Sequence, residues 1–168
     1  DNTVLLYIYD RKGERVQKQI IDSKGQELKK IFYVRNEQGQ ILVERHYEKQ
    51  ELKKELAYVY GPLGLIGFFQ KNQFFSVIKD HEGSIRLIVN EKGEVITAFD
   101  YLPYGQLARS IGQTDLIPFR YIGQEWDEDL NLYNFHARLY DPDLGRFYQT
   151  DPKSQSASPY LYAGNSPI

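Results

Sequence analysis

The 168-residue sequence predicts an all-β protein made of antiparallel β-hairpin repeats. Short β-rich runs follow one another through the first hundred residues, and several of them alternate apolar with polar residues, which is the period of a strand. Turn signals separate these runs at fairly regular spacing. The chain also holds 14 tyrosines and 9 phenylalanines, and aromatic residues are enriched in strands.

Five segments of the form Asp/Asn-x-x-Gly predict the turns. The first side chain can accept hydrogen bonds from backbone amides that follow it, and glycine can adopt the positive φ that closes a type I turn with a bulge. Gly61–Gly64 and Lys71-Asn72 are further turn candidates. The five segments are Asp10–Gly13, Asp22–Gly25, Asn36–Gly39, Asp80–Gly83 and Asn90–Gly93.

Nine strands are expected between these turns. Alternate residues from Ile41 to Tyr47 should share one face, as should alternate residues from Ile85 to Val89. The expected strands are Val4–Tyr9, Arg15–Ile21, Leu28–Arg35, Ile41–Tyr47, Leu52–Tyr60, Leu65–Gln70, Gln73–Lys79, Ser84–Val89 and Glu94–Tyr101.

The segment after Tyr101 has a different pattern. Pro103 and Gly105 predict a turn, with Tyr104 as a buried wedge. At most one short helix is expected, in residues 106–110 or 124–131, because acidic residues in the second segment suit a helix N-terminus.

Charge and hydropathy exclude several classes of protein. The net charge is −2, and the 21 basic and 23 acidic residues are interspersed, so we expect neither nucleic acid nor a membrane surface as a partner. No apolar run reaches the ~18 residues of a membrane span. The chain starts at Asp1 and contains no methionine, which suggests a fragment or a processed product, so the missing signal peptide says little about the parent protein.

No metal or cofactor is expected. The absence of cysteine excludes disulfides, thiolate ligands and thiol nucleophiles. His46, His81 and His136 do not have the spacing of metal ligands, and His136 is expected to be a packed side chain.

The segment Tyr121–Tyr148, YIGQEWDEDLNLYNFHARLYDPDLGRFY, resembles the Rhs-associated core signature. That signature ends the YD-repeat shells of Rhs polymorphic toxins, of the C components of insecticidal toxin complexes and of wall-associated contact toxins. Tyr9-Asp10 resembles a YD repeat, and residues 101–106 resemble the motif that precedes the core. The residues that carry the signature are Tyr104, Gly105, Gly123, Trp126, Tyr133, Tyr140, Asp141, Pro142, Gly145, Arg146 and Phe147.

The resemblance implies a strip of YD-like hairpins in residues 1–100 and an Rhs-associated core in residues 101–168 that curls inward and is incomplete at its C-terminus. It further implies a structural segment of a shell that encapsulates and helps deliver a C-terminal toxin. The expected partners are other YD repeats of the parent chain, or a second copy, and a downstream toxin domain. The parent protein is expected to be secreted or at the cell surface.

The resemblance also implies an aspartyl autoprotease, whose residues match Arg138 and Asp151. A guanidinium can keep one of two paired carboxylates ionised, as such chemistry requires. The second Asp-Pro-x-Gly of the family pattern, with the cleavage site, is absent from this sequence, so the fragment is expected to be inactive. The alternative for Arg138 and Asp151 is a buried ion pair that braces the core.

Other candidates have simpler interpretations. Asp141–Gly145 is expected to be a tight turn rather than a cation site. The acidic residues Glu125, Asp127, Glu128 and Asp129 could include a glycosidase-like pair but are expected to be a solvated loop. A third function, binding of carbohydrate or a cell surface by exposed tyrosines, is also open.

Overall fold

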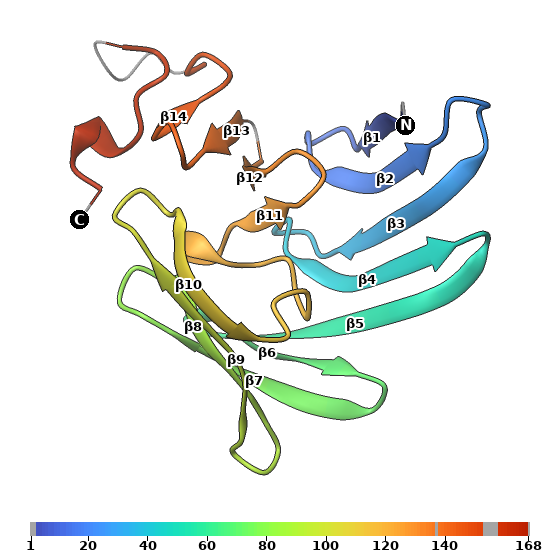
Figure 1. The fold of residues 1–168 in the computed structure, drawn as a ribbon, viewed down its shortest axis with the longest axis horizontal. Helices are drawn as coiled ribbons and strands as arrows, with labels where there is room; N and C mark the ends of the chain where they lie inside the picture. The colour runs from blue at the N-terminus through green and yellow to red at the C-terminus, as the bar shows by residue number, and fades with distance from the viewer. Residues whose placement is uncertain (1–2, 137, 153–157, 168) are drawn as a thin grey trace. The chain divides into compact units, whose positions relative to one another are not determined.

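A computed structural model describes residues 3–136, 138–152 and 158–167, and these residues form an antiparallel β protein. Ten strands follow one another in a sheet in chain order, and four form a second sheet (Figure 1). The described residues contain two short 3₁₀ helices and no α-helix, so the all-β prediction is confirmed. Within this part of the chain, no helix is long and apolar enough to cross a membrane.

The chain divides into two compact units, residues 1–76 and residues 77–168. This boundary falls inside a strand, whereas the predicted division at residue 100 separates two kinds of sequence motif and stays a prediction. The first unit contains β1 (Val4–Tyr9), β2 (Arg15–Ile21), β3 (Glu27–Arg35), β4 (Ile41–Glu48), β5 (Glu51–Gly61), β6 (Gly64–Gln70) and the start of β7 (Gln73–Lys79).

All five Asp/Asn-x-x-Gly turns form as predicted. At Asp10–Gly13 the glycine amide donates to the Asp10 carbonyl at 3.1 Å, and Gly13 has φ of +81°. The carboxylate of Asp10 accepts the backbone amides of Lys12 and Glu14 at 2.8 and 2.9 Å. The other four turns repeat this pattern, with side-chain hydrogen bonds between 2.8 and 3.1 Å. The same local hydrogen-bond pattern therefore closes all five of these turns.

Bulges beside these turns interrupt the period-two alternation that the sequence predicts. The register shifts between Ile8 and Tyr9 and between Val34 and Arg35. In β4, Ile41 is consequently buried together with Glu44, three residues on. In β8, Ile85 is likewise buried together with Ile88. The two faces predicted for these strands are therefore not kept along their whole length.

Two charged side chains are buried in the first unit. Arg15 and Glu44 are each only 2% exposed. The Arg15 guanidinium lies 4.4 Å from the ring centre of Tyr7. Glu44 accepts the Tyr58 hydroxyl at 2.7 Å and lies 2.6 Å from Nε2 of His46, so both of its carboxylate oxygens have a polar partner.

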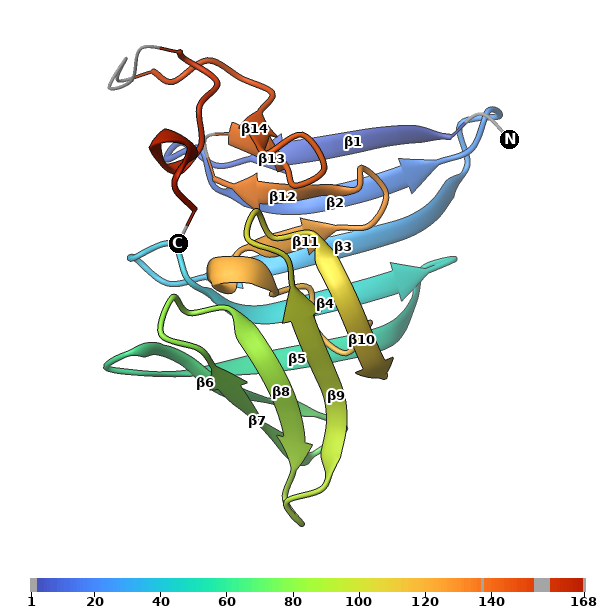
Figure 2. The same cartoon turned by 60° about the vertical axis from the view of Figure 1, so that its left-hand side comes forward.

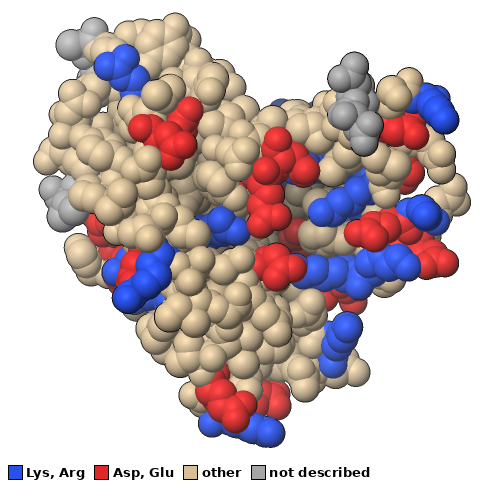
Figure 3. Space-filling model, in the orientation of Figure 1, with Lys and Arg blue, Asp and Glu red and all other residues tan. Residues whose placement is uncertain are grey.

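Basic and acidic side chains alternate over β3–β5, at the right of Figure 3. Arg45 on β4 contacts Glu55 on β5 at 2.6 Å, and Lys30 contacts Glu27 at 2.5 Å. These neighbours lie across or along strands of the first unit, so opposite charges are paired rather than gathered into one sign.

The second unit contains a three-strand meander and a small sheet (Figure 2). The meander consists of β8 (Ile85–Asn90), β9 (Val95–Tyr101) and β10 (Leu107–Gly112). The small sheet consists of β11 (Glu125–Asp127), β12 (Leu132–Phe135), β13 (Arg138–Asp141) and β14 (Arg146–Phe147). The 3₁₀ helices η1 (Tyr121–Gly123) and η2 (Ala163–Asn165) complete the unit.

Neither segment proposed as a short helix is helical. Residues 107–112 pair with β9, and residues 125–127 pair with β12. The acidic residues that suggested a helix N-terminus instead surround a turn, in which the Asp127 carboxylate accepts the amide of Asp129 at 3.2 Å. Pairing with a neighbouring strand thus overrides the local preference.

We predict that removing the acceptor of one turn weakens the first unit. Asp22→Ala deletes the bonds to the amides of Lys24 and Gln26, both 2.8 Å long, and should lower the free energy of unfolding by about 1–2 kcal/mol. Urea denaturation measures this loss as a lower midpoint with an unchanged dependence of the free energy of unfolding on urea concentration.

Asp22→Asn is the matched control, because Asn36 and Asn90 make the same bonds in their own turns. Its denaturation midpoint should stay near that of the parent chain. Equal losses for the alanine and asparagine variants would show that the acceptor oxygen is not what stabilises the turn.

Candidate functional site

The turn Leu102–Gly105 is the centre of the second unit. Its backbone repeats the other hairpin turns, with Gly105 N donating to Leu102 O at 2.8 Å, although its first residue is a leucine. Gly105 has φ of +87°, and a Cβ on it would lie 2.5 Å from the Tyr121 ring. Glycine is therefore required here both by conformation and by space.

Three tyrosine hydroxyls bind three successive carbonyls of this turn. Tyr121 donates to Pro103 O at 2.8 Å, Tyr140 donates to Tyr104 O at 2.8 Å, and Tyr133 donates to Gly105 O at 3.1 Å. We call these three tyrosines the tyrosine clamp. Because they come from η1, β13 and β12, the clamp ties the small sheet to the end of the β9–β10 hairpin.

The rings of the clamp form the hydrophobic core of this unit together with Phe147. All four side chains are at most 7% exposed. Tyr101 packs against Tyr121, Trp126 packs against Tyr133, and Tyr162 packs against Tyr140 with ring centres 4.5 Å apart. Most of these pairs are tilted or edge-on, which is the arrangement that aromatic quadrupoles favour.

Burial raises the pKa of each clamp tyrosine well above its ordinary value of 10.0. Loss of hydration is the largest cause for all three, because the phenolate would be left in an apolar core. A hydrogen bond and a neighbouring charge from Tyr162 add to the shift of Tyr121. These hydroxyls therefore stay protonated and donate their hydrogen bonds over a wide pH range.

The other signature residues mainly shape turns. The Asp141 carboxylate accepts the amides of Asp143 and Leu144 at 2.9 and 3.1 Å, as expected for a capped tight turn. Gly145 has φ of +63°, and a Cβ on it would lie 3.0 Å from the Tyr104 ring. Gly123, with φ of +70°, ends η1.

Tyr104, expected as a buried wedge, is only partly buried, and its hydroxyl donates to Asn165 O at 3.1 Å. Pro142 stands in the turn that follows β13, and Arg146 lies on β14 with its side chain exposed. His136 was expected to be packed, but it is exposed with φ of +59°. Ala137, which belongs to the signature, lies outside the described residues.

Arg138 begins β13 and Asp151 follows β14, and the antiparallel pairing of the two strands directs both residues toward the same end of the hairpin. The Arg138 guanidinium lies 3.7 Å from the ring centre of Phe147, and its Nη1 is buried without a hydrogen-bond partner among the described residues. The amide of Asp151 donates to Pro159 O at 2.8 Å. Both interpretations of Arg138 and Asp151, a catalytic pair and a bracing ion pair, stay predictions.

The acidic cluster differs from the solvated loop that was expected. Glu125 is 7% exposed and Asp127 is 2% exposed, whereas Glu128 and Asp129 are exposed. Glu125 accepts the side-chain amide of Asn134 at 3.2 Å. The alternation of β11 points the carboxylates of Glu125 and Asp127 inward. In the described parts of the chain, no three side chains that could bind a metal ion lie together.

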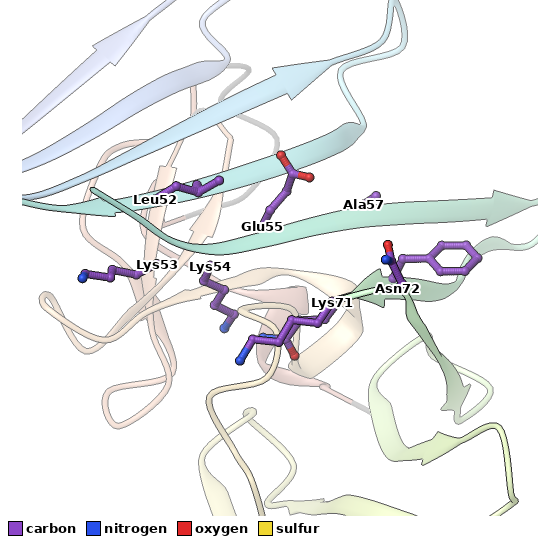
Figure 4. Close-up of a pocket in the computed structure, with 9 residues that line it drawn as sticks. Leu52, Lys53, Lys54, Glu55, Ala57, Lys71 and Asn72 are labelled. Atoms are coloured by element: carbon purple, nitrogen blue, oxygen red, sulfur yellow. The ribbon is translucent and has the colours of Figure 1, made fainter. Parts of the chain in front are cut away.

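Each unit contains a cavity. A cavity of about 340 Å³ in the first unit lies between β5 and the β6–β7 turn. Figure 4 shows Lys54 and Lys71 extending toward the same region of this cavity. A second cavity, of about 500 Å³, lies in the second unit beside Arg120 and Trp126. Sequence analysis did not single out Arg120, whose only signal is a lone cation between aromatic residues.

A hairpin strip that ends in a tyrosine-bound core defines a segment of a YD shell. The profile of the Teneurin YD-shell family matches residues 1–162, so the chain belongs to that family. This confirms the family resemblance that the sequence motifs indicated.

Related proteins are much longer than this chain. It is 48% identical to Salivary gland surface protein 1 of Aedes aegypti over 95% of this chain and 5% of that protein. It is 26% identical to the tRNA nuclease WapA of Bacillus subtilis (strain 168) over 100% of this chain and 7% of that protein.

The fold matches that of a toxin complex. The crystal structure of TcdB2-TccC3 without its hypervariable C-terminal region superposes with a TM-score of 0.67 and 18% identity, over 98% of this chain and 10% of that one. The chain is therefore a structural segment of a YD shell and spans no more than a tenth of these relatives.

We predict that Tyr140→Ala lowers the free energy of unfolding by about 3–5 kcal/mol, because the fully buried ring leaves a cavity and Tyr104 O loses its donor. Tyr140→Phe keeps the ring and should cost about 1–2 kcal/mol. Chemical denaturation measures both values, and an unchanged midpoint for the alanine variant would refute the burial of this ring.

We predict a loss of stability above pH 10 that the clamp causes. The folded pKa values lie above the unfolded value of 10, so the stabilisation is complete below pH 10 and falls as the unfolded chain ionises first. Each clamp tyrosine adds up to about 1.4 kcal/mol per pH unit to this slope.

Chemical denaturation from pH 9 to 11.5 measures how steeply the free energy of unfolding falls with pH. Tyr140→Phe should remove the contribution of about one titrating proton from this dependence. Tyr148→Phe should leave the dependence unchanged, because Tyr148 is 59% exposed in the folded chain. The same slope in all three proteins would mean that the clamp hydroxyls do not carry the alkaline transition.

Proposed function

We propose that this segment forms part of the wall and end of a shell that encapsulates a toxic polypeptide and helps to deliver it. The tyrosine clamp is the observation that carries the proposal. It folds the chain that follows the last hairpin into a small sheet, which is bound to that hairpin's turn through three hydroxyls. A shell needs such a rigid end, because irregular chain alone would open readily.

The relatives support a toxin as the enclosed polypeptide. WapA is named as a tRNA nuclease, and the chain is 33% identical over 100 residues to the Double-stranded DNA deaminase toxin A of Burkholderia cenocepacia. Both of those proteins are many times longer than the matched segment. A toxic domain elsewhere in the parent of this chain is the corresponding proposal.

The proposed partners on the N-terminal side are other YD repeats of the parent chain. Strand β1 pairs only with β2 among the described strands, and Val4, Leu6 and Ile8 on it are each more than 40% exposed. An apolar edge strand pairs readily with another strand. Further YD repeats of the same chain would pair with the free edge of β1. Alternatively, the edge of β1 in a second copy of the chain would pair with it.

The parent protein is proposed to be secreted or displayed at the cell surface. The mosquito relative is named as a surface protein, which agrees with that location. Carbohydrate or cell-surface recognition by exposed aromatic rings such as Tyr9 and Phe32 is a separate proposal, which binding to a glycan array would test.

Limited proteolysis of the full-length parent tests encapsulation. We expect the toxic domain to resist protease while the shell is folded, and to be digested when Tyr140→Ala opens the core. Tyr148→Phe, a change at an exposed ring, should leave the protection intact. Digestion of the toxic domain in the unaltered parent would contradict encapsulation.

We also propose that the complete parent cleaves itself, with Asp151 as the catalytic carboxyl and Arg138 beside it. The buried Nη1 of Arg138 favours this second function, because an unsatisfied guanidinium can hold a carboxylate in its ionised form. The second carboxyl of an aspartyl mechanism would have to come from chain that follows this segment.

Intact mass of the parent with its native extension tests cleavage. Two fragments are expected from the wild type, and one uncut chain is expected from Asp151→Asn and from Arg138→Lys. Asp143→Asn is the control, because Asp143 lies in an exposed turn, and it should still be cut. A wild type that stays whole would leave Asp151 without a catalytic role.

A further inference from the structure

The side chain of Gln149 ends the pairing of β13 with β14. The ladder between these strands continues one step past β14, where the amide of Tyr148 donates to Leu139 O at 2.9 Å. In such an antiparallel pair the two residues exchange both hydrogen bonds, so the amide of Leu139 would next donate to the carbonyl of Tyr148. It donates instead to Oε1 of Gln149 at 2.6 Å. A side chain thus takes the place of a strand carbonyl, and the backbone leaves the ladder at this point.

The chain that leaves the ladder forms a bulge before Asp151. Phe147 N donates to Tyr160 O at 3.0 Å, and Asp151 N donates to Pro159 O at 2.8 Å. The two donors are four residues apart, whereas the two acceptors are adjacent in the chain. Four residues of extended strand cover about 13 Å, but adjacent residues have Cα atoms only about 3.8 Å apart. Residues 148–150 must therefore bow out of line.

Gln149 stands in the middle of this bulge, two residues before Asp151. Its hydrogen bond to Leu139 joins the bulge to the residue that follows Arg138 in β13. The Arg138 guanidinium is held at the same place, 3.7 Å from the ring centre of Phe147, where the bulge begins. The contacts of one short segment therefore reach the surroundings of both proposed cleavage residues.

We propose that Gln149 is a positioning residue for self-cleavage, an inference that rests on the cleavage proposed above. The Gln149 side chain holds the bulge against β13, and this sets the path of the backbone from Phe147 to Asp151 relative to Arg138. It acts through the backbone and not on the reacting atoms. Placement matters for such a reaction, because a displacement of about 1 Å can lower a rate about a hundredfold.

The reaction that Gln149 supports is hydrolysis of one peptide bond. Water adds its oxygen to the carbonyl carbon, the C–N bond breaks, and the amine leaves with a proton from the carboxyl pair. Water is the one co-reactant, and the products carry a new carboxyl and a new amino end. The neutral amide of Gln149 neither gives nor takes a proton in these steps. Its contribution is therefore confined to the geometry of the catalytic groups.

Three variants of the full-length parent test this role, with intact mass following the cut fraction over time in a cell-free translation. Gln149→Ala removes the acceptor and should slow cleavage at least about tenfold. Gln149→Glu keeps an acceptor oxygen at the same reach and should cleave within about threefold of the wild type. Thr150→Ala changes an exposed side chain one residue nearer to Asp151 and should leave the rate unchanged.

Amide exchange of Leu139 in the 168-residue chain measures the hydrogen bond itself. The exchange should be at least about tenfold faster in Gln149→Ala and should stay slow in Gln149→Glu and Thr150→Ala. The urea midpoints of all three variants should lie near that of the parent chain, because both side chains are exposed. Slow cleavage by Gln149→Ala would then not be a result of unfolding.

Equal cleavage by Gln149→Ala and the wild type would overturn the positioning role and leave self-cleavage standing. Equal slowing by the alanine and glutamate variants would also overturn it, because the acceptor oxygen would then not matter. A wild type that stays whole would end the cleavage proposal and this role with it. In that case, faster exchange of Leu139 in Gln149→Ala would define Gln149 as a structural end of the strand ladder alone.

Discussion

Hydrogen bonding between tyrosine hydroxyls and the carbonyls of one turn is the constraint on which residues 77–168 depend. The carbonyls of residues 103–105 point away from the β9–β10 ladder and need donors. Tyrosine can supply a donor from deep within a core, because the ring fills apolar space while its tip stays polar. One residue type therefore satisfies the packing of the small sheet and the backbone of the turn together.

Most of the hairpin strip could be predicted from the sequence, because its turns are set within five residues. Asp22 or Asn90 with the glycine three positions on contains the whole physical cause of a turn. The bulges could not be predicted in the same way. Each adds one residue to a strand, and this places Glu44 rather than Val43 at a buried position, where Tyr58 and His46 bind its carboxylate.

The arrangement of the candidate site could not be predicted from the sequence. The signature includes Tyr133 and Tyr140, but their hydroxyl partners lie 28 and 36 residues away in the chain. Residues 107–112 were missed as a strand, because their pairing depends on β9 rather than on alternation. Arg120 carries no pattern of its own, and its burial follows from rings that only the fold brings to it.

The separation between the clamp and its turn also determines when each unit can fold during synthesis. In residues 1–76 every strand pairs with the strand just made, so hairpins can form one after another as the chain emerges. The turn at 103–105 must instead wait until Tyr140 has been made. Until then its carbonyls face water, and the nascent chain ends in an unfinished core that chaperones could recognise.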